Sequence, residues 1–326
     1  MNIIFIFSKP LKMHAAGQRG IALVVVLWVL ALLMIIATEL VYTVRVDSKS
    51  AANFSDETGA QAQVAAGINI GLTEISVPYK FVVLDSEGSV RFIRQQDDKE
   101  KPERAFDLGE GRFKYVIEDE SGKLNLNTAS REIIVNLLRN SGISGSALDT
   151  LVDSIIDWRD DNHEHHLNGA EDDFYNSLPK PYGAKDGPFD TVEEVLLVKG
   201  MSPEIFYGKE KARLNGTNLS ESEFKGIAQH LTVWGDGKIN INTAGEEVLK
   251  AAFGEGTAHE ILLRRKTEGY YNLPAFGGVV SSGVFSVIST GTVHGLSFKV
   301  RALVKKMGSD VKIIYLNEEG FPVGAE

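Results

Sequence analysis

The chain has 326 residues, of which 43% are hydrophobic and 24% are charged, and its formal net charge is −10. This composition is that of a folded protein and excludes a disordered one. The acidic balance argues against nucleic acid or anionic lipid as a main partner. Because the chain contains no cysteine, its stability must come from core packing, bound metal or partner subunits.

An apolar run follows a short basic leader. The run extends from Ile21 to Thr38 without a charge, and a helix of this length spans about 27 Å, close to the roughly 30 Å core of a bilayer. Glu39 is the first charge after it. The leader has three basic residues and no acid: Lys9, Lys12 and Arg19. The positive-inside rule therefore predicts a cytoplasmic N-terminus and export of everything after the run.

A candidate cleavage site, Gly20–Ile21, lies before the apolar run. An ordinary secretory signal has its small cleavage-site residues after the apolar core. The order found here resembles a type IV prepilin leader, in which residues 1–20 are removed on the cytoplasmic face and the helix stays as anchor and assembly stem. Removal of the three basic residues would take the net charge from −10 to −13. An uncleaved signal anchor is the alternative, and Met13 is a second candidate start.

Hydrophobic periodicity predicts an α+β protein with a helical insertion. We expect a transmembrane segment at 21–42 and its helical continuation at 43–75, where three glycines either weaken the helix or permit close packing. Alternating and β-branched runs predict strands at 79–84, 89–94, 111–119, 284–291, 296–305 and 311–316. A small antiparallel sheet would then be built from 76–120 and 280–326, and the insertion would occupy 121–279.

The insertion contains an internal repeat. The sequence SGKLNLNTA at 121–129 recurs as DGKININTA at 236–244. Each copy leads into an amphipathic helix and, after a turn, a second helix, which gives helices at 132–138, 147–159, 246–253 and 258–266. Four residues stand where helix N-caps are expected: Asn127, Thr128, Asn242 and Thr243. A looser third unit covers 190–206.

These units resemble helix-hairpin-helix modules, including those of DNA uptake receptors. Such modules hold phosphates with turn amides and nearby basic residues. The helix after the first hairpin ends instead in four acids, Asp153, Asp157, Asp160 and Asp161, which would repel a phosphate backbone. We therefore expect a structural scaffold and no nucleic-acid partner. A membrane-anchored DNA receptor remains the alternative from another class.

The densest chemical signal is the acidic loop at 157–173, in which only Arg159 opposes the carboxylates. Calcium selects such oxygen ligands and takes about six to eight of them. The candidate calcium ligands are Asp160, Asn162, Glu171 and Asp172. An EF-hand is not expected because His165 stands where its glycine belongs. A solvated loop without metal is one alternative, and zinc bound by three neighbouring histidines (His163, His165 and His166) is another, although these residues can hardly converge on one ion.

No enzyme is expected. The sequence has no phosphate-binding glycine loop, no His-Glu-x-x-His zinc motif, no Gly-x-Ser-x-Gly and no cysteine nucleophile.

Three features together identify a family: the leader junction with its apolar stem, the helical insertion between strands, and the acidic loop closed by Gly-Ala-Glu-Asp at 169–172. The continuation has Tyr-x-x-Leu-Pro-x-Pro-Tyr at 175–182, Pro-Phe-Asp-Thr-Val-Glu-Glu-Val at 188–195 and Val-Lys-Gly-Met at 198–201. The chain resembles the general secretion pathway protein K family, the large minor pseudopilins of type II secretion systems.

The resemblance implies a pseudopilin fold, in which a long N-terminal helix packs on a small antiparallel sheet that carries a large α-domain. It implies cleavage by prepilin peptidase, methylation of the new N-terminus, and calcium in the α-domain. The implied place is the tip of a periplasmic pseudopilus anchored in the bacterial inner membrane, where the protein initiates or caps assembly. The implied partners are minor pseudopilins I and J, with other pseudopilus and inner-membrane platform subunits. A minor pilin of a type IV pilus is the alternative within this structural class.

Val25 gains meaning from this resemblance, because it is the fifth residue of a chain that starts at Ile21. Most pilin-like proteins have glutamate there, which is thought to neutralise the N-terminal amine of a neighbouring subunit. A buried carboxylate without a partner is costly. A tip subunit has no subunit ahead of it to pair with, so valine suits this position, and the Ile21 amine stays free for the next subunit. The plain alternative is that Val25 is one more membrane residue.

Overall fold

The computed structural model describes residues 18–84, 88–95, 103–208 and 226–318, with only the backbone for 18–20. Two compact units make up the chain, residues 1–58 and 59–326. In the first unit, the described residues form the N-terminal part of helix α1 (Gln18–Ser76). Among the described residues α1 is the one helix that is long and apolar enough to cross a membrane. Its apolar side chains from Ile21 to Val46 are exposed, which fits a single-pass membrane anchor.

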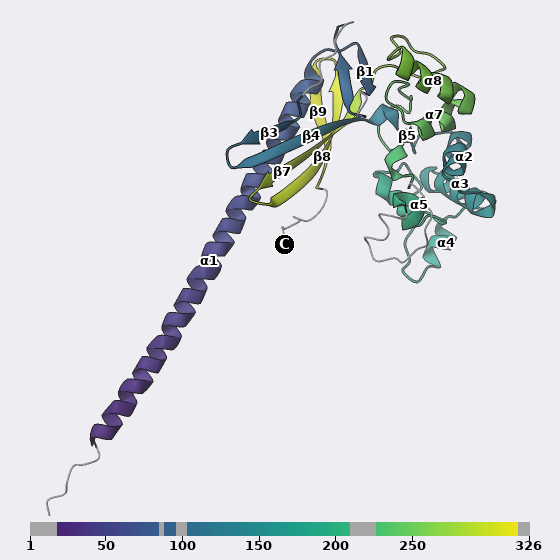
Figure 1. Ribbon diagram of the computed structural model, residues 1–326. Helices are drawn as coiled ribbons and strands as arrows, with labels where there is room; N and C mark the ends of the chain where they lie inside the picture. Colours follow the sequence, from purple (N-terminus) through teal and green to yellow (C-terminus); the bar gives the residue numbers. More distant parts are fainter. Residues whose placement is uncertain (1–17, 85–87, 96–102, 209–225, 319–326) are drawn as a thin grey trace, which may run out of the picture. The chain divides into compact units, whose positions relative to one another are not determined.

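In the second unit, the last part of α1 packs on a sheet (Figure 1). Glycines make this packing close: a β-carbon on Gly67 would lie 2.2 Å from Ser289 Oγ, and one on Gly71 would lie 2.6 Å from Val287 Cγ1. The helical glycines therefore serve close packing, which is one of the two readings that the sequence left open. Helix α1 also carries a buried carboxylate, Glu74, which accepts hydrogen bonds from Arg104 at 2.6 Å and Tyr115 at 3.0 Å.

The sheet has five antiparallel strands in the order β3-β4-β7-β8-β9, and β1 and β2 form a separate antiparallel pair. The strands are β1 (Phe81–Leu84), β2 (Val90–Ile93), β3 (Ala105–Leu108), β4 (Gly111–Asp119), β7 (Val284–Val293), β8 (Leu296–Met307) and β9 (Asp310–Glu318). Every second side chain of the long strands faces α1, because side chains alternate between the two faces of a sheet. Ile117, Val287 and Val304 are buried there. Strand β3 was not predicted, because its sequence Ala-Phe-Asp-Leu contains no β-branched residue.

The insertion lies between β4 and β7 and is mostly helical (Figure 1). Its elements are η1 (Glu120–Gly122), β5 (Leu124–Asn125), α2 (Arg131–Asn140), α3 (Gly145–Arg159), α4 (Asp172–Asn176), η2 (Val192–Leu197), α5 (Pro203–Tyr207), η3 (Ala228–His230), β6 (Leu231–Thr232), α7 (Glu246–Phe253) and α8 (Glu255–Thr267). Strands β5 and β6 pair in parallel. Two buried clusters form its interior, one around α2 and α3 and the other around α7 and α8.

The expected N-caps were wrong. Ser130 caps α2, since its side chain accepts a hydrogen bond from Ile133 N, and Gly245 stands at the cap of α7. Asn127 and Asn242 instead form hydrogen bonds with the backbone of residues far along the chain. Asn127 accepts from Phe189 N at 2.7 Å and donates to Phe189 O at 3.0 Å. Asn242 does the same with Tyr271, at 2.8 and 2.9 Å. A turn lies between each asparagine and its helix, so neither side chain can reach the helix amides.

An arginine completes each hairpin in the same way. Arg159, at the end of α3, donates to the carbonyl oxygens of Leu126 and Ala129. Arg265, near the end of α8, donates to the equivalent carbonyl oxygens of Ile241 and Ala244. Burial lowers the pKa of Arg265 to about 10. These half-buried cations face main-chain oxygens, so they bind the hairpins together and do not present charge to a phosphate.

The insertion leaves the sheet at the end where α1 terminates. Asp119 and Phe285 are the last paired residues of β4 and β7 before it. At the neighbouring end of β8, Lys306 Nζ donates to the carbonyl oxygens of Ile75 at 2.5 Å and Ser76 at 2.9 Å. Lys306 thus caps the C-terminus of α1, and the insertion departs from the sheet near that terminus.

Candidate cation site

Four carboxylates from separate parts of the insertion gather beside the end of α3. Asp157 lies on the last turn of α3, Asp160 is its C-cap, Glu171 is the N-cap of α4, and Asp186 belongs to the following loop. Oxygen atoms of Asp157 and Asp160 and a ring nitrogen of His166 lie within 4.8 Å of one another. The carboxylates thus form a compact anionic group, drawn from a longer stretch of chain than the acidic loop alone.

Glu171 is the most informative member of this group. It is only 4% exposed, and neither of its carboxylate oxygens has a hydrogen-bond partner. Its carboxylate faces that of Asp186, and Asp186 Oδ1 is also buried without a donor. Burial, followed by the charges of Asp186, Asp157 and Asp160, raises the pKa of Glu171 to about 7. A buried carboxylate without a donor that faces a second, half-buried carboxylate needs either a proton or a cation.

Asp157, unlike Glu171, has hydrogen-bond donors around its carboxylate. It is fully buried, and its carboxylate accepts hydrogen bonds from His166 N at 3.1 Å and Ala170 N at 2.8 Å, besides contacting the His166 ring. A β-carbon on Gly169 would lie 1.7 Å from Asp157 Oδ2. Asp157 therefore fixes the loop that leads to Glu171, and most of its bonding capacity is already used.

Two of the four residues named as calcium ligands from the sequence, Asp160 and Glu171, belong to this group. The other two lie outside it. Asn162 is exposed, and its Nδ2 donates to Asp160 Oδ1 at 2.6 Å while its Oδ1 accepts from Glu164 N. Asp172 is exposed at the start of α4, and its carboxylate accepts from Ala184 N at 2.9 Å. Both side chains shape the turns around the group.

Sequence reasoning missed Asp157 and Asp186 as members of the group. Asp157 was counted among the acids of the loop, but nothing local distinguished it as the carboxylate on the buried face of α3. Asp186 lies in a separate loop and has a positive φ of 49°. No sequence spacing connects it with Glu171. The unusual backbone angle follows from the fold and leaves no mark in the local sequence.

The three histidines of the loop have separate partners. His163 Nδ1 lies 3.0 Å from Asp186 Oδ2, His165 Nδ1 lies near the His166 carbonyl oxygen, and His166 contacts Asp157. Among the described residues they do not converge on a common point. The expectation that these neighbours cannot hold one zinc ion agrees with this arrangement.

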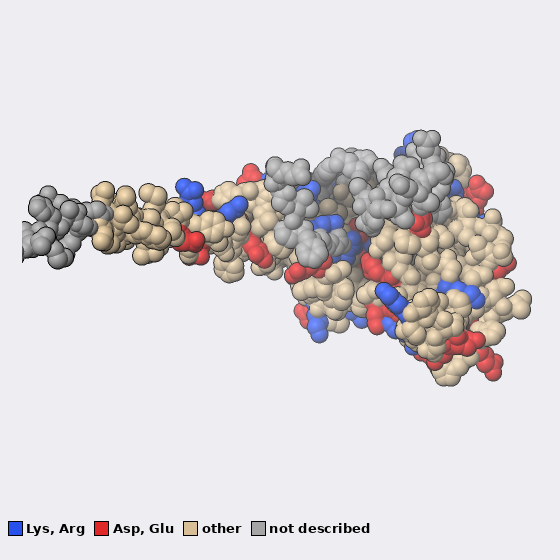
Figure 2. Space-filling model, turned by 90° about the horizontal axis from the view of Figure 1, so that it is seen from below, with Lys and Arg blue, Asp and Glu red and all other residues tan. Residues whose placement is uncertain are grey.

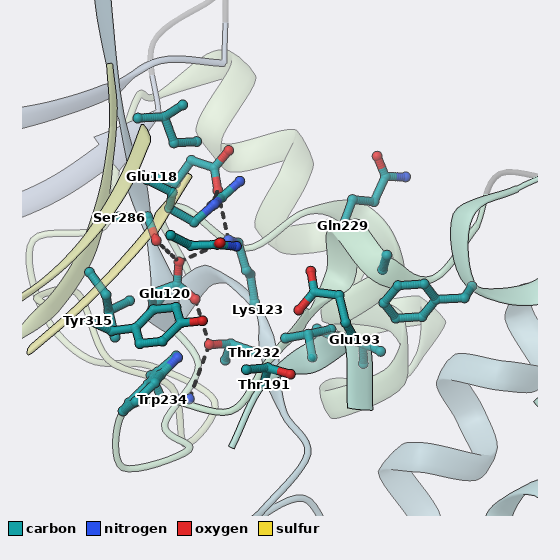
Figure 3. Close-up of a pocket in the computed structure, with 18 of the residues that line it drawn as sticks. Glu118, Glu120, Lys123, Thr191, Glu193, Gln229, Thr232, Trp234, Ser286 and Tyr315 are labelled. Atoms are coloured by element: carbon teal, nitrogen blue, oxygen red, sulfur yellow. Dashed lines mark hydrogen bonds and ion pairs between the residues drawn. The ribbon is translucent and has the colours of Figure 1, made fainter. Parts of the chain in front are cut away.

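A second feature is a cleft of about 570 Å³ between the insertion and the sheet face that points away from α1 (Figure 3). Its floor is an ion cluster in which Lys123 lies 2.8 Å from Glu118 and 3.0 Å from Glu120. Glu120 also accepts from Thr232 of β6 at 2.5 Å and Ser286 of β7 at 2.6 Å. These polar groups of the insertion and the sheet bind one another. The floor of the cleft therefore connects the insertion to the sheet.

Charges on the visible surface are mixed. In the view of Figure 2, blue Lys and Arg side chains lie among red Asp and Glu side chains and do not gather into a broad basic face. This agrees with a net charge of −10. On α1, the assembly residues named from the sequence, Ile21 and Val25, are 66% and 53% exposed. The side chain of Arg19, beside the Gly20–Ile21 junction, lies outside the described residues.

Comparison with known proteins points to one family. A family model described as type II secretion system (T2SS), protein K, matches residues 116–208, which include the whole carboxylate group. Type II secretion system protein K of Pseudomonas aeruginosa is 26% identical over 279 residues, which are 80% of this chain and 76% of that protein. The chain therefore resembles the type II secretion system protein K family in sequence. This similarity supports a minor pseudopilin of type II secretion.

Other proteins show the same similarity. Type II secretion system protein K of Klebsiella pneumoniae is 25% identical over 214 residues, which are 58% of this chain and 60% of that protein. A chain in the crystal structure of the GspK-GspI-GspJ complex from the type 2 secretion system of enterotoxigenic Escherichia coli matches with a TM-score of 0.58 and 15% identity. That match covers 84% of this chain and all of the other. It confirms the predicted α+β pseudopilin fold with its long N-terminal helix.

Proposed function

We propose that this minor pseudopilin occupies the tip of the pseudopilus, where it initiates or caps assembly for protein export. The observation that carries the proposal is the place of the insertion. It leaves the β4–β7 pair at the end where α1 terminates, next to the Lys306 contacts with Ile75 and Ser76. In a filament of parallel α1 helices, that end points away from the membrane, and a domain there obstructs any subunit stacked above it.

Val25 supports the same position. A chain that starts at Ile21 has no carboxylate at its fifth residue, so it cannot neutralise the amine of a subunit ahead of it. An unpaired carboxylate there would be buried in an apolar bundle. The protein would then stand first, with its own amine available to the subunit below. This arrangement requires cleavage between Gly20 and Ile21 by prepilin peptidase, and a periplasmic location for the chain after the anchor.

Minor pseudopilins I and J are the proposed partners, with the platform subunits of the inner membrane. Support comes from the solved complex, whose title names GspK, GspI and GspJ together. The net charge of −10 and the use of Arg159 and Arg265 on main-chain carbonyls give no support to a DNA receptor. The resemblance to protein K gives no support to an enzymatic role.

The tip position is tested by labelling. An epitope in the insertion should be found only at filament ends and in low copy, whereas labelling along the filament would refute the proposal. N-terminal sequencing of the extracted protein should begin at Ile21. V25E should give no gain in pseudopilus assembly, and a clear gain would remove the argument from residue 25. The periplasmic part should copurify with those of I and J and not form homopolymers.

We also propose that the insertion binds calcium at the carboxylate group. Glu171 and Asp186 would hold the ion, with Asp160 beside them, because their buried oxygens lack donors and are the hard ligands calcium prefers. A bound cation would supply the positive charge that this group otherwise lacks. Asp157 would act chiefly by holding the loop, since its oxygens already accept hydrogen bonds.

A further inference from the structure

Lys199 has a place in the fold that the assembly function does not explain. It belongs to the Val-Lys-Gly-Met segment after η2, and the left-handed Gly200 (φ 87°) turns the chain behind it. Lys199 Nζ donates to Gly169 O at 2.8 Å and to Asn168 O at 3.4 Å. The same ammonium lies 4.8 Å from the centre of the Phe174 ring. A cation is thus directed at main-chain oxygens just before Glu171.

Residues 168–170 form the short segment that leads to Glu171, and carboxylates of α3 hold its other side. Asp153 Oδ2 accepts from Asn168 N at 3.2 Å and from Asn168 Nδ2 at 3.0 Å. Asp157 Oδ2 accepts from Ala170 N at 2.8 Å. The amides of Asn168 and Ala170 therefore face two aspartates of α3, while the carbonyl oxygens of 168 and 169 face Lys199. The backbone is fixed on both sides up to the residue that carries the unpartnered carboxylate.

We propose that Lys199 is a positioning residue for the cation site at Glu171 and Asp186. The inference rests on the calcium site proposed above. By binding the carbonyl oxygens of Asn168 and Gly169, the ammonium keeps the peptide of this segment in one orientation, and the Glu171 carboxylate emerges from it already directed at Asp186. Outer contacts of this kind commonly change metal affinity by about 10- to 100-fold when removed.

Two effects of Lys199 on calcium have opposite signs, which makes the inference testable. If the ammonium acted only as a charge near a dication, it would repel calcium, and its removal would tighten binding. If it positions Glu171, its removal loosens the segment and weakens binding, because the site must then be ordered by the ion itself. The sign of the change in dissociation constant separates these cases.

The experiment is a calcium titration of the full chain in detergent, by calorimetry, for wild type, K199M, K199R and K185M. Lys185 is the matched control because it pairs with Asp190 at 2.6 Å and Glu194 at 2.9 Å and has no contact with the 168–169 carbonyls. K199M should raise the dissociation constant about tenfold. K199R, which keeps the charge and the donors, should bind within about threefold of wild type, and K185M should not weaken binding.

Wild-type or tighter binding by K199M overturns the inference while leaving the site intact. Equal weakening by K185M overturns it too, since loss of any nearby lysine would then suffice. If K199M is unfolded in chelator, K199Q replaces it. Its shorter, neutral side chain cannot serve both carbonyl oxygens, so its dissociation constant should also rise, and an unchanged value overturns the inference. Failure of the site itself is recognised separately: wild type would bind no calcium, and E171Q would be indistinguishable from it.

Discussion

Gly169 lies directly against the buried carboxylate of Asp157, so closely that a β-carbon at residue 169 would stand 1.7 Å from Asp157 Oδ2. The backbone angle at residue 169 is one that other residues adopt, but the carboxylate of Asp157 leaves no space for a β-carbon there. The contact lets Asp157 reach Ala170 N at 2.8 Å and thereby shape the loop before Glu171.

G169A is therefore expected to lower the free energy of unfolding by about 1–3 kcal/mol, since an added methyl must displace a buried, hydrogen-bonded carboxylate. Denaturant unfolding of the variant measures the loss. G187A is the matched control in the next loop, where the nearest atom to an added β-carbon is Lys185 O at 3.8 Å. Equal stability of G169A and wild type would contradict the close packing.

Calcium should raise the melting temperature of the wild-type protein, and chelator should reverse the rise. A ligand that binds only the folded state adds about 2.7 kcal/mol at a concentration one hundred times its dissociation constant. E171Q should lose most of that gain, because it removes a charged oxygen from the buried pair with Asp186. E164Q, an exposed change in the same loop, should keep it. Identical melting in millimolar calcium and in chelator would show that the carboxylates hold no calcium.

N127D should destabilise the protein strongly, by about 2–3 kcal/mol or more, although it changes one atom of the side chain. The amide nitrogen of Asn127 donates to Phe189 O at 3.0 Å and Val233 O at 3.2 Å. An aspartate oxygen there would face two carbonyl oxygens and leave them without a donor. N242D should follow the same direction, and N272D, at an exposed position, should be near neutral. Thermal unfolding ranks the three, and a mild N127D would argue against the clamp.

K306M should lower stability by about 1–2 kcal/mol, because the carbonyl oxygens at the C-terminus of α1 lose a charged donor. Lys306 donates to Ile75 O and Ser76 O, and its ammonium lies 5.1 Å from the centre of the Tyr79 ring. K305M changes the neighbouring, exposed lysine and provides the control. Unfolding curves that coincide for the two variants would mean that the cap contributes nothing.

Protonation of Glu118 should lower the free energy of unfolding at acid pH. Burial raises its pKa, but Lys123 and Arg301 outweigh burial and lower it from 4.5 to about 2. A carboxyl with a depressed folded-state pKa stabilises the fold above its unfolded pKa and loses that contribution as pH falls through the folded one. Stability should therefore decline from about pH 4.5 toward pH 2. E118Q should be less stable at pH 7 and lose less on acidification, whereas E260Q, exposed on α8, should behave as wild type. A parallel decline in E118Q and wild type would exclude this cause.

The sequence by itself determined the features that depend on neighbouring residues. The apolar run from Ile21 to Thr38 predicts the membrane helix, and alternation predicts the long strands β4, β7, β8 and β9 within a few residues. The amphipathic period places α7 at the residues where the structure has it. These elements arise from local periodicity, and a period is visible in the order of residues. The family resemblance rested on contiguous motifs for the same reason.

Tertiary structure decided which distant side chains meet. Glu171 and Asp186 face each other although no pattern links them, and Asn127 holds Phe189 where local rules predicted a helix cap. From the sequence, the three glycines of α1 could either weaken the helix or permit close packing, and only their contacts with the sheet distinguish the two. In each case the deciding energy is a contact between residues far apart along the chain: a buried charge, a close approach or a hydrogen bond to distant backbone. Such contacts exist only once the chain has folded, so they leave no period and no spacing to find.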